Sequence, residues 1–188
     1  EINDVFVPDN FTYLESGPPR DPGPMYVMQK APLFPIGFAT ISIALARACL
    51  DDATKLAVEK TQRAVGGAMI ERSTVHRQIG ETEAILRAAD TYLRSTTAAA
   101  WTSAQDHSEI DMDKRIDVRI AATYAIRQAS AVVDSAYEMF GSDAVFKRNK
   151  LQRRYQDMHV IAQQLQGRAT NYETGGRYFL GLDPTGMM

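Results

Sequence analysis

The side chains that most often bind metals or transfer protons are few and scattered in this chain. Its three histidines are His76, His107 and His159, and none belongs to a Glu-x-x-His or His-x-x-x-His motif. A di-iron bundle of the ferritin type needs Glu-x-x-His motifs. Cys49 is the only cysteine, which excludes an internal disulfide and a thiolate metal cluster. We therefore predict no metal site and an inert core thiol.

Anion-binding motifs are equally sparse. Gly66-Gly67 and Gly175-Gly176 are isolated pairs typical of helix ends and turns, so no glycine-rich phosphate loop is predicted. The segment 147–154, KRNKLQRR, is the one local excess of positive charge. One interpretation is a solvated helix start in which Arg153 pairs with Asp157, and the other is a patch that meets a phosphate-bearing cofactor or substrate.

The composition sets limits on the class of protein. The chain has 188 residues and nearly balanced charge, with 21 Lys and Arg against 23 Asp and Glu. This balance argues against a nucleic-acid binder that depends on a broad basic field. The single cysteine and the absence of a signal peptide favour a cytoplasmic location.

The elements that must position these residues are long helices. Apolar residues recur every three or four positions, which predicts helices over about 35–62, 74–105, 112–140 and 150–167, and a short helix or turn over 172–180. Short connections between long helices predict an all-α, up-and-down four-helix bundle. The alanine stripe of segment 112–140 predicts close, near-antiparallel packing against a neighbour.

The segment 31–50 is apolar and nearly long enough to span a membrane. Pro32 and Pro35 lie at its start and Arg47 near its end, and the helical part is only half to three-quarters of a span. We therefore predict no membrane span, but a helix fully buried inside the bundle.

The first thirty residues differ from the rest. Val5, Phe6 and Val7 favour a strand that Pro8 ends, and segment 15–24 has four prolines and two glycines. We therefore predict that residues 1–30 are the end of a β domain and a linker, and that residues 31–188 form a helical domain. The chain also starts without a Met, which suggests a piece of a longer protein.

Five motifs in this order resemble the C-terminal part of the acyl-CoA dehydrogenase superfamily. They are similar to the end of the family's middle β domain, its first bundle helix, its helix-to-loop glycine motif, its "LQR…RD" helix and its "GR…LGL" ending. In this sequence they are DVFVP (4–8), ARACLDDATKLAVE (46–59), YEMFGSDA (137–144), LQRRYQD (151–157) and GGRYFLGL (175–182). The "LQR" and "LGL" motifs are more similar to the flavin-dependent aromatic hydroxylase and dibenzothiophene monooxygenase branch than to the straight-chain dehydrogenases.

The resemblance implies half of a flavin-dependent oxidoreductase. Family members bind FAD or reduced FMN between a β domain and the helical bundle, so the fragment alone is expected to bind no flavin and to be inactive. Their bundles pack into homodimers or homotetramers. An acyl-CoA or aromatic substrate is implied, with a flavin reductase or an electron-transfer protein as partner. Lys60 stands where dehydrogenases carry a flavin-contacting arginine, and the Gly141 loop is the other implied flavin contact.

The family's catalytic base is missing from its expected place. The hydroxylase histidine falls seven residues after Asp157, at Gln164, and the dehydrogenase glutamate falls at Leu165. An amide accepts no proton at neutral pH, so Gln164 is expected to hydrogen-bond the substrate or flavin. His159 could replace the base only if the helix were rotated, because it lies nearly opposite Gln164 on a continuous helix.

Three hypotheses follow. The first is the bundle domain of a hydroxylase-like flavoenzyme, with an acyl-CoA dehydrogenase proper as the other enzymatic choice. The second, motivated by the missing base, is a non-catalytic helical oligomerisation module. The third is a free-standing helical binding protein with an unrelated ligand.

Overall fold

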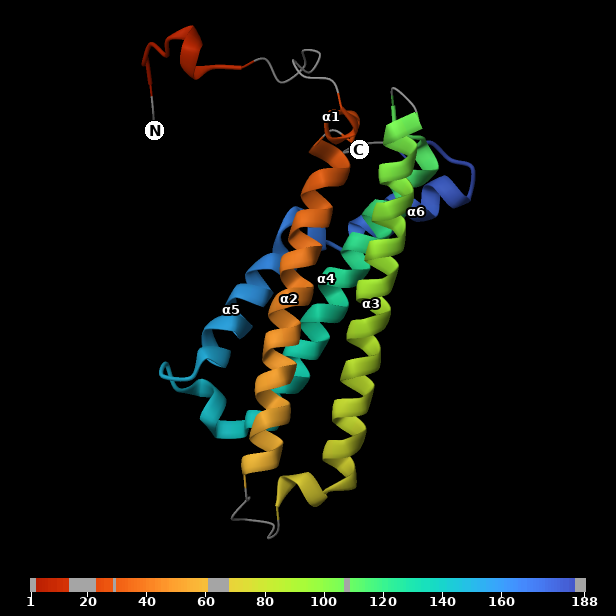
Figure 1. The fold of residues 1–188 in the computed structure, drawn as a ribbon. Coiled ribbons are helices and arrows are strands. Elements are labelled where there is room, and N and C mark those ends of the chain that lie inside the picture. Colours follow the sequence, from red (N-terminus) through yellow and green to blue (C-terminus); the bar gives the residue numbers. More distant parts are fainter. Residues whose placement is uncertain (1–2, 14–22, 29, 61–67, 107–108, 185–188) are drawn as a thin grey trace.

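The computed structural model describes residues 3–13, 23–28, 30–60, 68–106 and 109–184. Three helices longer than 28 residues dominate it: α2 (Lys30–Glu59), α3 (Ser73–Asp106) and α4 (Met112–Phe140) (Figure 1). The shorter helices are α1 (Pro24–Val27), α5 (Lys150–Gln163) and α6 (Thr170–Phe179). Single 3-10 turns lie at η1 (Asp9–Phe11), η2 (Met69–Glu71), η3 (Gly141–Val145) and η4 (Leu165–Gly167). The predicted all-α class is confirmed.

Helices α2 to α5 run alternately down and up, which is the predicted up-and-down arrangement (Figure 1). The observed helix α4 has the predicted bounds, and α3 differs from its prediction by one residue at each end. Helix α2 begins at Lys30, five residues before its predicted start, so it includes Pro32 and Pro35. Pro32 lies in the first turn, whose N–H groups have no partner within the helix, whereas Pro35 lies inside the helix in its second turn.

Small residues on α2 and α4 form the centre of the bundle. On α2 they are Ala39, Ser42, Ala46, Cys49, Ala53 and Ala57, all at most 3% exposed. On α4 they are Ala121, Ala122, Ala125, Ala129 and Ala136, all fully buried. Because side chains this short let two backbones approach closely, α4 packs most extensively against α2. The alanine stripe therefore meets a helix that runs parallel to α4, and the predicted near-antiparallel partner is wrong for this contact.

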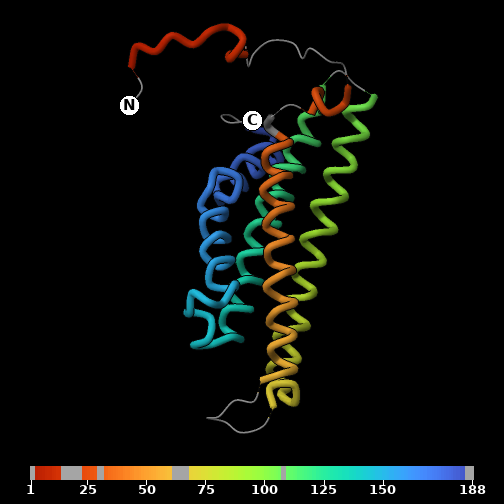
Figure 2. The backbone as a smooth tube through the Cα atoms, turned by 60° about the vertical axis from the view of Figure 1, so that its left-hand side comes forward, coloured from red at the N-terminus to blue at the C-terminus, as the bar shows by residue number. Residues whose placement is uncertain are grey.

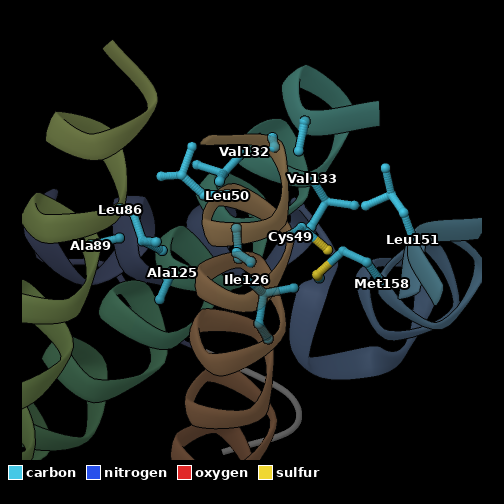
Figure 3. Packing of buried hydrophobic residues seen from close by; sticks show 14 of the residues in the cluster. Cys49, Leu50, Leu86, Ala89, Ala125, Ile126, Val132, Val133, Leu151 and Met158 are labelled. Carbon is cyan, nitrogen blue, oxygen red and sulfur yellow. The ribbon is translucent and has the colours of Figure 1, made fainter. Parts of the chain in front are cut away.

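Larger side chains from the flanking helices close the core on two sides. Figure 3 shows Leu86 and Ala89 of α3 on one side of the α2–α4 pair, and Leu151 and Met158 of α5 on the other. Figure 2 shows the same order of helices from a second direction. Met158 points toward Cys49, whose thiol is buried in the same cluster. Burial raises the pKa of the Cys49 thiol to about 11, so this sulfur is a core atom and not a nucleophile.

Two predicted elements differ from the structure. Residues 5–7 form no strand, because a strand needs a neighbour for its hydrogen bonds and none is present among the described residues. Their side chains are exposed, from 49% for Val7 to 86% for Phe6. The predicted helix over 150–167 ends at Gln163, because Gln164 adopts an extended conformation with a ψ of 158°. Most of the predicted linker lies outside the described residues, as do Gly66-Gly67 and His107.

Helix α2 is buried on one face only. Its segment Pro32–Glu59 is long and apolar enough to cross a membrane, yet only 33% of its most apolar window is buried. Phe34 and Ile41 are more than half exposed, and they share an outer surface with Leu33, Gly37 and Phe38. This differs from the fully buried helix that the sequence predicts. The inner stripe of small residues completes the bundle, while the outer apolar face has no cover in the described chain.

Candidate functional site

The loop between α5 and α6 follows directly on Gln164, where the resemblance places the family's catalytic base. Gln164 follows the last residue of α5, and its side-chain Oε1 accepts a hydrogen bond from the backbone N–H of Gln166 at 2.8 Å. This bond begins the 3-10 turn η4, so the oxygen of the Gln164 amide is already used within the chain. The side-chain Oε1 of Gln166 is buried and has no hydrogen-bond partner. The loop thus contains one amide that shapes it and another whose oxygen is unsatisfied.

Asn171 of α6 fixes the backbone of this loop. Its Nδ2 donates to the carbonyl oxygens of Leu165 and Gln166, both at 3.1 Å, and to Thr123 Oγ1 at 3.0 Å. Thr123 of α4 donates from Oγ1 to the same Gln166 carbonyl at 3.0 Å. Both side chains are at least 95% buried. The loop is therefore held to α4 and α6 by a buried polar network, which keeps its shape without a bound ligand.

Gly167 and Arg127 complete the attachment. A methyl group added at Gly167 would lie 2.7 Å from the carbonyl oxygen of Ala162, so only glycine allows the chain to pass this close to the end of α5. Arg127 Nη1 donates to the Gly167 carbonyl at 3.3 Å. Glycine at this position is thus a requirement of the close packing between η4 and α5.

A buried arginine lies beside this network. Arg119 of α4 is only 8% exposed, and its Nη1 donates to Asn171 Oδ1 at 3.1 Å. Burial is the main cause that lowers the pKa of Arg119, and the neighbouring charge of Arg115 adds to it. An arginine remains protonated even when its pKa is lowered, so a full positive charge lies in this part of the core.

His159 is not directed at the loop as a free base. Its Nε2 lies 3.1 Å from Asp134 Oδ1 of α4, and its ring packs against Tyr155 at 4.3 Å between centroids. The imidazole and the carboxylate are about half exposed. We predicted that His159 and Gln164 lie on opposite sides of one continuous helix. Because α5 ends at Gln163 and Gln164 is not helical, this argument does not apply to the structure. The contacts of His159 are those of a side chain that joins α5 to α4.

The two residues expected to contact flavin come together at the other end of the bundle. Lys60 follows α2, and its Nζ donates to Asp143 Oδ2 at 2.7 Å and to the carbonyl of Phe140, next to Gly141, at 3.2 Å. Gly141 ends α4 with a φ of +58°, and a side chain added there would meet open space. The lysine lowers the pKa of the Asp143 carboxyl, first through this hydrogen bond and then through its charge. This end presents a cation and an exposed glycine backbone, which suit an anionic cofactor group.

The basic segment at the start of α5 is divided between the two interpretations. The predicted pair of Arg153 and Asp157 is present at 3.6 Å and is well exposed. Arg154 forms an ion pair with Asp52 of α2, which ties α5 to α2. Arg148 lies over the ring of Phe146 at 4.6 Å and is exposed. Of the five cations, Arg153 and Arg154 thus form ion pairs and Arg148 lies over a ring. Lys147 and Lys150 are exposed, and Lys150 lies close to the Lys60 end.

A groove of about 740 Å³ lies between α2 and α3 and was not predicted. Its apolar lining includes Ile36, Ile43, Leu93 and Trp101. Arg47 at its edge donates to Glu83 at 2.6 Å, which joins the two helices and lowers the pKa of Glu83. Within the described ranges, no group of three or more His, Cys, Asp or Glu side chains is placed to bind a metal.

The structure therefore brings Lys60 and Gly141 together, and places Gln164 and His159 elsewhere with intramolecular partners. The sequence did not lead us to expect roles for Arg119 and Asn171. A signal was available, because Arg115, Arg119, Thr123 and Arg127 follow one another at four-residue spacing, which places polar side chains on one face of α4.

Comparison with known proteins places this chain among flavoenzyme relatives. The family described as "Acyl-CoA dehydrogenase, C-terminal domain" matches residues 36–166. The indole-3-acetate monooxygenase of Pseudomonas putida is 23% identical over 183 residues, which is 97% of this chain and 47% of that enzyme. The chain thus spans about half the length of the curated relatives that it matches.

Two solved structures share the fold. XiaF from Streptomyces sp., solved in complex with FADH2 and glycerol, has a TM-score of 0.82 at 17% identity, over 89% of this chain and 43% of XiaF. The 3-HSA hydroxylase from Rhodococcus sp. RHA1 has a TM-score of 0.80 at 20% identity, over 89% of this chain and 44% of that one. Because both identities are low, the similarity to these two structures shows that the chains share a fold and shows nothing further.

Proposed function

Because this chain belongs to the acyl-CoA dehydrogenase C-terminal domain family, we propose that it is the C-terminal helical domain of a flavin-dependent monooxygenase. The observation that carries the proposal is the similarity to an indole-3-acetate monooxygenase along 97% of the chain. The substrate class is a small aromatic compound. The bundle supplies one wall of the substrate and flavin sites, and the upstream half of the enzyme supplies the other.

A division of the chain into two parts belongs to this proposal. We propose that residues 1–30 are the end of the β domain and its linker, and that residues 31–188 are the bundle domain. The apolar outer face of α2, with Phe34 and Ile41 more than half exposed, is the kind of surface that another part of the enzyme covers. The membrane alternative is disfavoured, because the inner face of the same helix packs in a bundle that carries charges at its surface. A cytoplasmic enzyme fits these features.

Lys60 and the Gly141 loop are the proposed flavin contacts. Lys60 Nζ meets phosphate as a point charge, for which it must exchange the Asp143 carboxylate at 2.7 Å. The exposed backbone at Gly141 allows close approach of the cofactor. The flavin is FAD or reduced FMN, and when bound it supplies the electrons and the activation of oxygen. The fragment alone is not expected to bind it, since the β domain forms the rest of the site.

The α5–α6 loop is proposed to position the substrate. Neither Gln164 nor Gln166 can accept a proton at neutral pH, so these amides hold the substrate or shape the loop by hydrogen bonds alone. Gln164 Oε1 already accepts a hydrogen bond from the Gln166 N–H, which leaves the Nε2 amide group of Gln164 to donate to a ligand. His159, paired with Asp134, remains the second candidate base.

Homo-oligomers and small molecules are the proposed partners. The bundle is expected to form dimers or tetramers, and a flavin reductase or an electron-transfer protein is expected to exchange electrons with the enzyme. Apolar side chains such as Ile41 and Val58 on the outer side of α2 give surfaces that fit such contacts. Nucleic acid is not among the proposed partners.

The missing base favours one further candidate, a non-catalytic oligomerisation module of the same fold. An acyl-CoA dehydrogenase proper is less well supported, because Leu165 stands at the position of its glutamate and its backbone carbonyl is bound by Asn171. A monooxygenase consumes oxygen, a dehydrogenase oxidises acyl-CoA, and a non-catalytic module does neither, so assays of the complete protein distinguish these alternatives.

The test uses the full-length protein with its upstream half. We expect it to bind FAD or reduced FMN at micromolar concentration and to consume oxygen when an aromatic substrate such as indole-3-acetate is added. Replacement Gln164→His is expected to change the pH profile of this activity, because it introduces a proton acceptor. The matched control is Gln163→His, an exposed position one residue earlier at the end of α5. A protein that binds no flavin and forms only a stable oligomer would support the module.

A further inference from the structure

One face of α4 carries three arginines, and two of them, Arg119 and Arg127, contact the α5–α6 junction. Arg115, Arg119, Thr123 and Arg127 follow at four-residue spacing, so their side chains lie along one side of the helix. Thr123 and Arg127 bind the carbonyls of Gln166 and Gly167, which fixes this side against the loop. Arg119 lies between these contacts and Arg115, beside Asn171. The face is therefore positive and adjoins the loop proposed to hold the substrate.

The charge on Arg119 has no counter-ion within the described chain. Its guanidinium has five N–H donors, of which one hydrogen bond, from Nη1 to Asn171 Oδ1, is formed with the described residues. No carboxylate of these residues lies within ion-pair distance, although the side chain is 92% buried (8% exposed). Buried charges in folded proteins are nearly always paired, because an unpaired one loses its hydration without compensation. An anion from outside the described chain would remove this cost.

Arg115 strengthens the case. It lies one helical turn before Arg119, and among the residues with described coordinates it also has no carboxylate partner. Like charges at this spacing repel each other, and Arg115 contributes to the lowered pKa of Arg119. Nearby, the buried Oε1 of Gln166 lacks a hydrogen-bond donor. Arg119 thus has unused cationic donors beside Asn171, and Gln166 of the same loop has an unused acceptor.

We propose that Arg119, assisted by Arg115, binds an oxyanion at the α5–α6 junction. This oxyanion is the carboxylate of an aromatic acid substrate, or it is the phosphate of the flavin if Lys60 at the other end of the bundle does not hold that phosphate. A guanidinium binds both groups through two parallel hydrogen bonds. The Gln166 amide oxygen then accepts a hydrogen bond from an N–H or O–H elsewhere on the same ligand. The inference deepens the proposed function and rests on it, since it names the chemistry of the ligand at the same loop.

The experiment compares anionic ligands with neutral analogues, using calorimetric binding to the full-length protein. Indole-3-acetate is paired with indole-3-acetamide, and FMN with riboflavin. The wild-type protein is expected to bind one anionic member about ten- to a hundredfold more tightly than its neutral analogue. Arg119→Met is expected to abolish that preference, and Arg119→Lys to retain part of it. A preference in the first pair that Arg119→Met removes identifies the substrate carboxylate as the ligand of Arg119. A preference in the second pair that Arg119→Met removes identifies the flavin phosphate, in which case Arg119 and not Lys60 is the phosphate contact.

Two further variants keep the test decisive. Arg115→Met, at a less buried position, is expected to reduce the preference severalfold even if Arg119→Met folds poorly. Arg153→Met is the control, because this arginine is exposed on α5 and should leave the preference unchanged. The proposal is overturned if the wild-type protein prefers neither anion, or if both Arg119→Met and Arg115→Met keep the wild-type preference.

These binding results are independent of turnover. An enzyme that consumes oxygen with a bound flavin but shows no anion preference would overturn the Arg119 site alone. A protein that selects aromatic acids through Arg119 but shows no flavin-dependent oxygen consumption would overturn the proposed function instead.

Discussion

The two ends of the bundle hold their candidate residues in opposite ways. At the α5–α6 junction, backbone carbonyls of the loop are bound by Asn171, Thr123 and Arg127, and the first two side chains are buried. At the other end, Lys60 meets Asp143 and the Phe140 carbonyl near the surface, and Gly141 is open to solvent. Both ends carry positive charge, but within the described part of the chain only the second has a carboxylate against its cation.

This difference indicates what each end can do. A buried and fully tied loop keeps one shape before a ligand arrives, so the cost of ordering it is already met by folding. An exposed ion pair contributes little to stability and exchanges partners easily. The junction therefore suits precise placement of a small ligand, and the Lys60 end suits a charge contact that forms when a cofactor or another subunit arrives. The following predictions test that contrast.

The largest effect is expected at Asn171. Asn171→Leu removes donors to two loop carbonyls and leaves Arg119 without its hydrogen-bonded partner in a buried site. The free energy of unfolding should fall by about 3 kcal/mol, since each buried polar group left unpaired costs about 1–3 kcal/mol. Urea denaturation of the chain measures this. Thr170→Ala, at the exposed neighbouring position, should change it by less than about 0.5 kcal/mol. Equal urea midpoints for Asn171→Leu and wild type would contradict the picture of a tied loop.

A second test uses two glycines of the same region that should respond with opposite signs. Gly167→Ala forces a methyl group to within 2.7 Å of a backbone oxygen, which should destabilise the chain by about 1–3 kcal/mol. Gly176→Ala lies inside α6, where an added methyl meets nothing within 4 Å. It should stabilise the chain by about 0.5–1 kcal/mol, because glycine is unfavourable inside a helix. Thermal unfolding of both variants measures these changes in stability. A Gly167→Ala variant more stable than wild type would show that the loop is free to move.

The sequence predicted the helices well, because their apolar periodicity is long and uninterrupted. Helix α4 has its predicted bounds, since Gly141 ends it in the left-handed region that glycine favours. The small residues of α2, from Ala39 to Ala57, also recur every three or four positions. They could have predicted that α2 is the close partner of α4, but periodicity alone does not say which stripe meets which.

The site was less predictable because its geometry depends on contacts between distant residues. The end of α5 at Gln163 depends on Gln164 capping η4 and on Gly167 fitting against Ala162, neither of which a helical pattern reports. Asn171 and Thr123 are 48 positions apart, so their hydrogen bond has no local signature. The prediction of a strand at residues 5–7 was wrong for a related reason. A strand needs a neighbouring strand for its hydrogen bonds, and the local preference of the residues does not supply one.

The smallest effect is expected at the Lys60 end. Lys60→Met removes the hydrogen bond and the charge that lower the pKa of the Asp143 carboxyl, so this pKa should rise toward the ordinary aspartate value of about 3.9. A group with a depressed pKa in the folded state adds stability above its unfolded pKa and loses it as the pH falls through the folded pKa. Any stability difference between wild type and Lys60→Met should therefore be constant near neutral pH and vanish in acid. Carboxyl-carbon NMR titration of Asp143 measures the pKa directly, with Lys55→Met as an exposed control on α2. An unchanged pKa of Asp143 in Lys60→Met would mean that the ion pair is not populated in solution. Lys60 would then be free to bind an anion without first leaving Asp143. The contrast between the two ends of the bundle would be larger in that case.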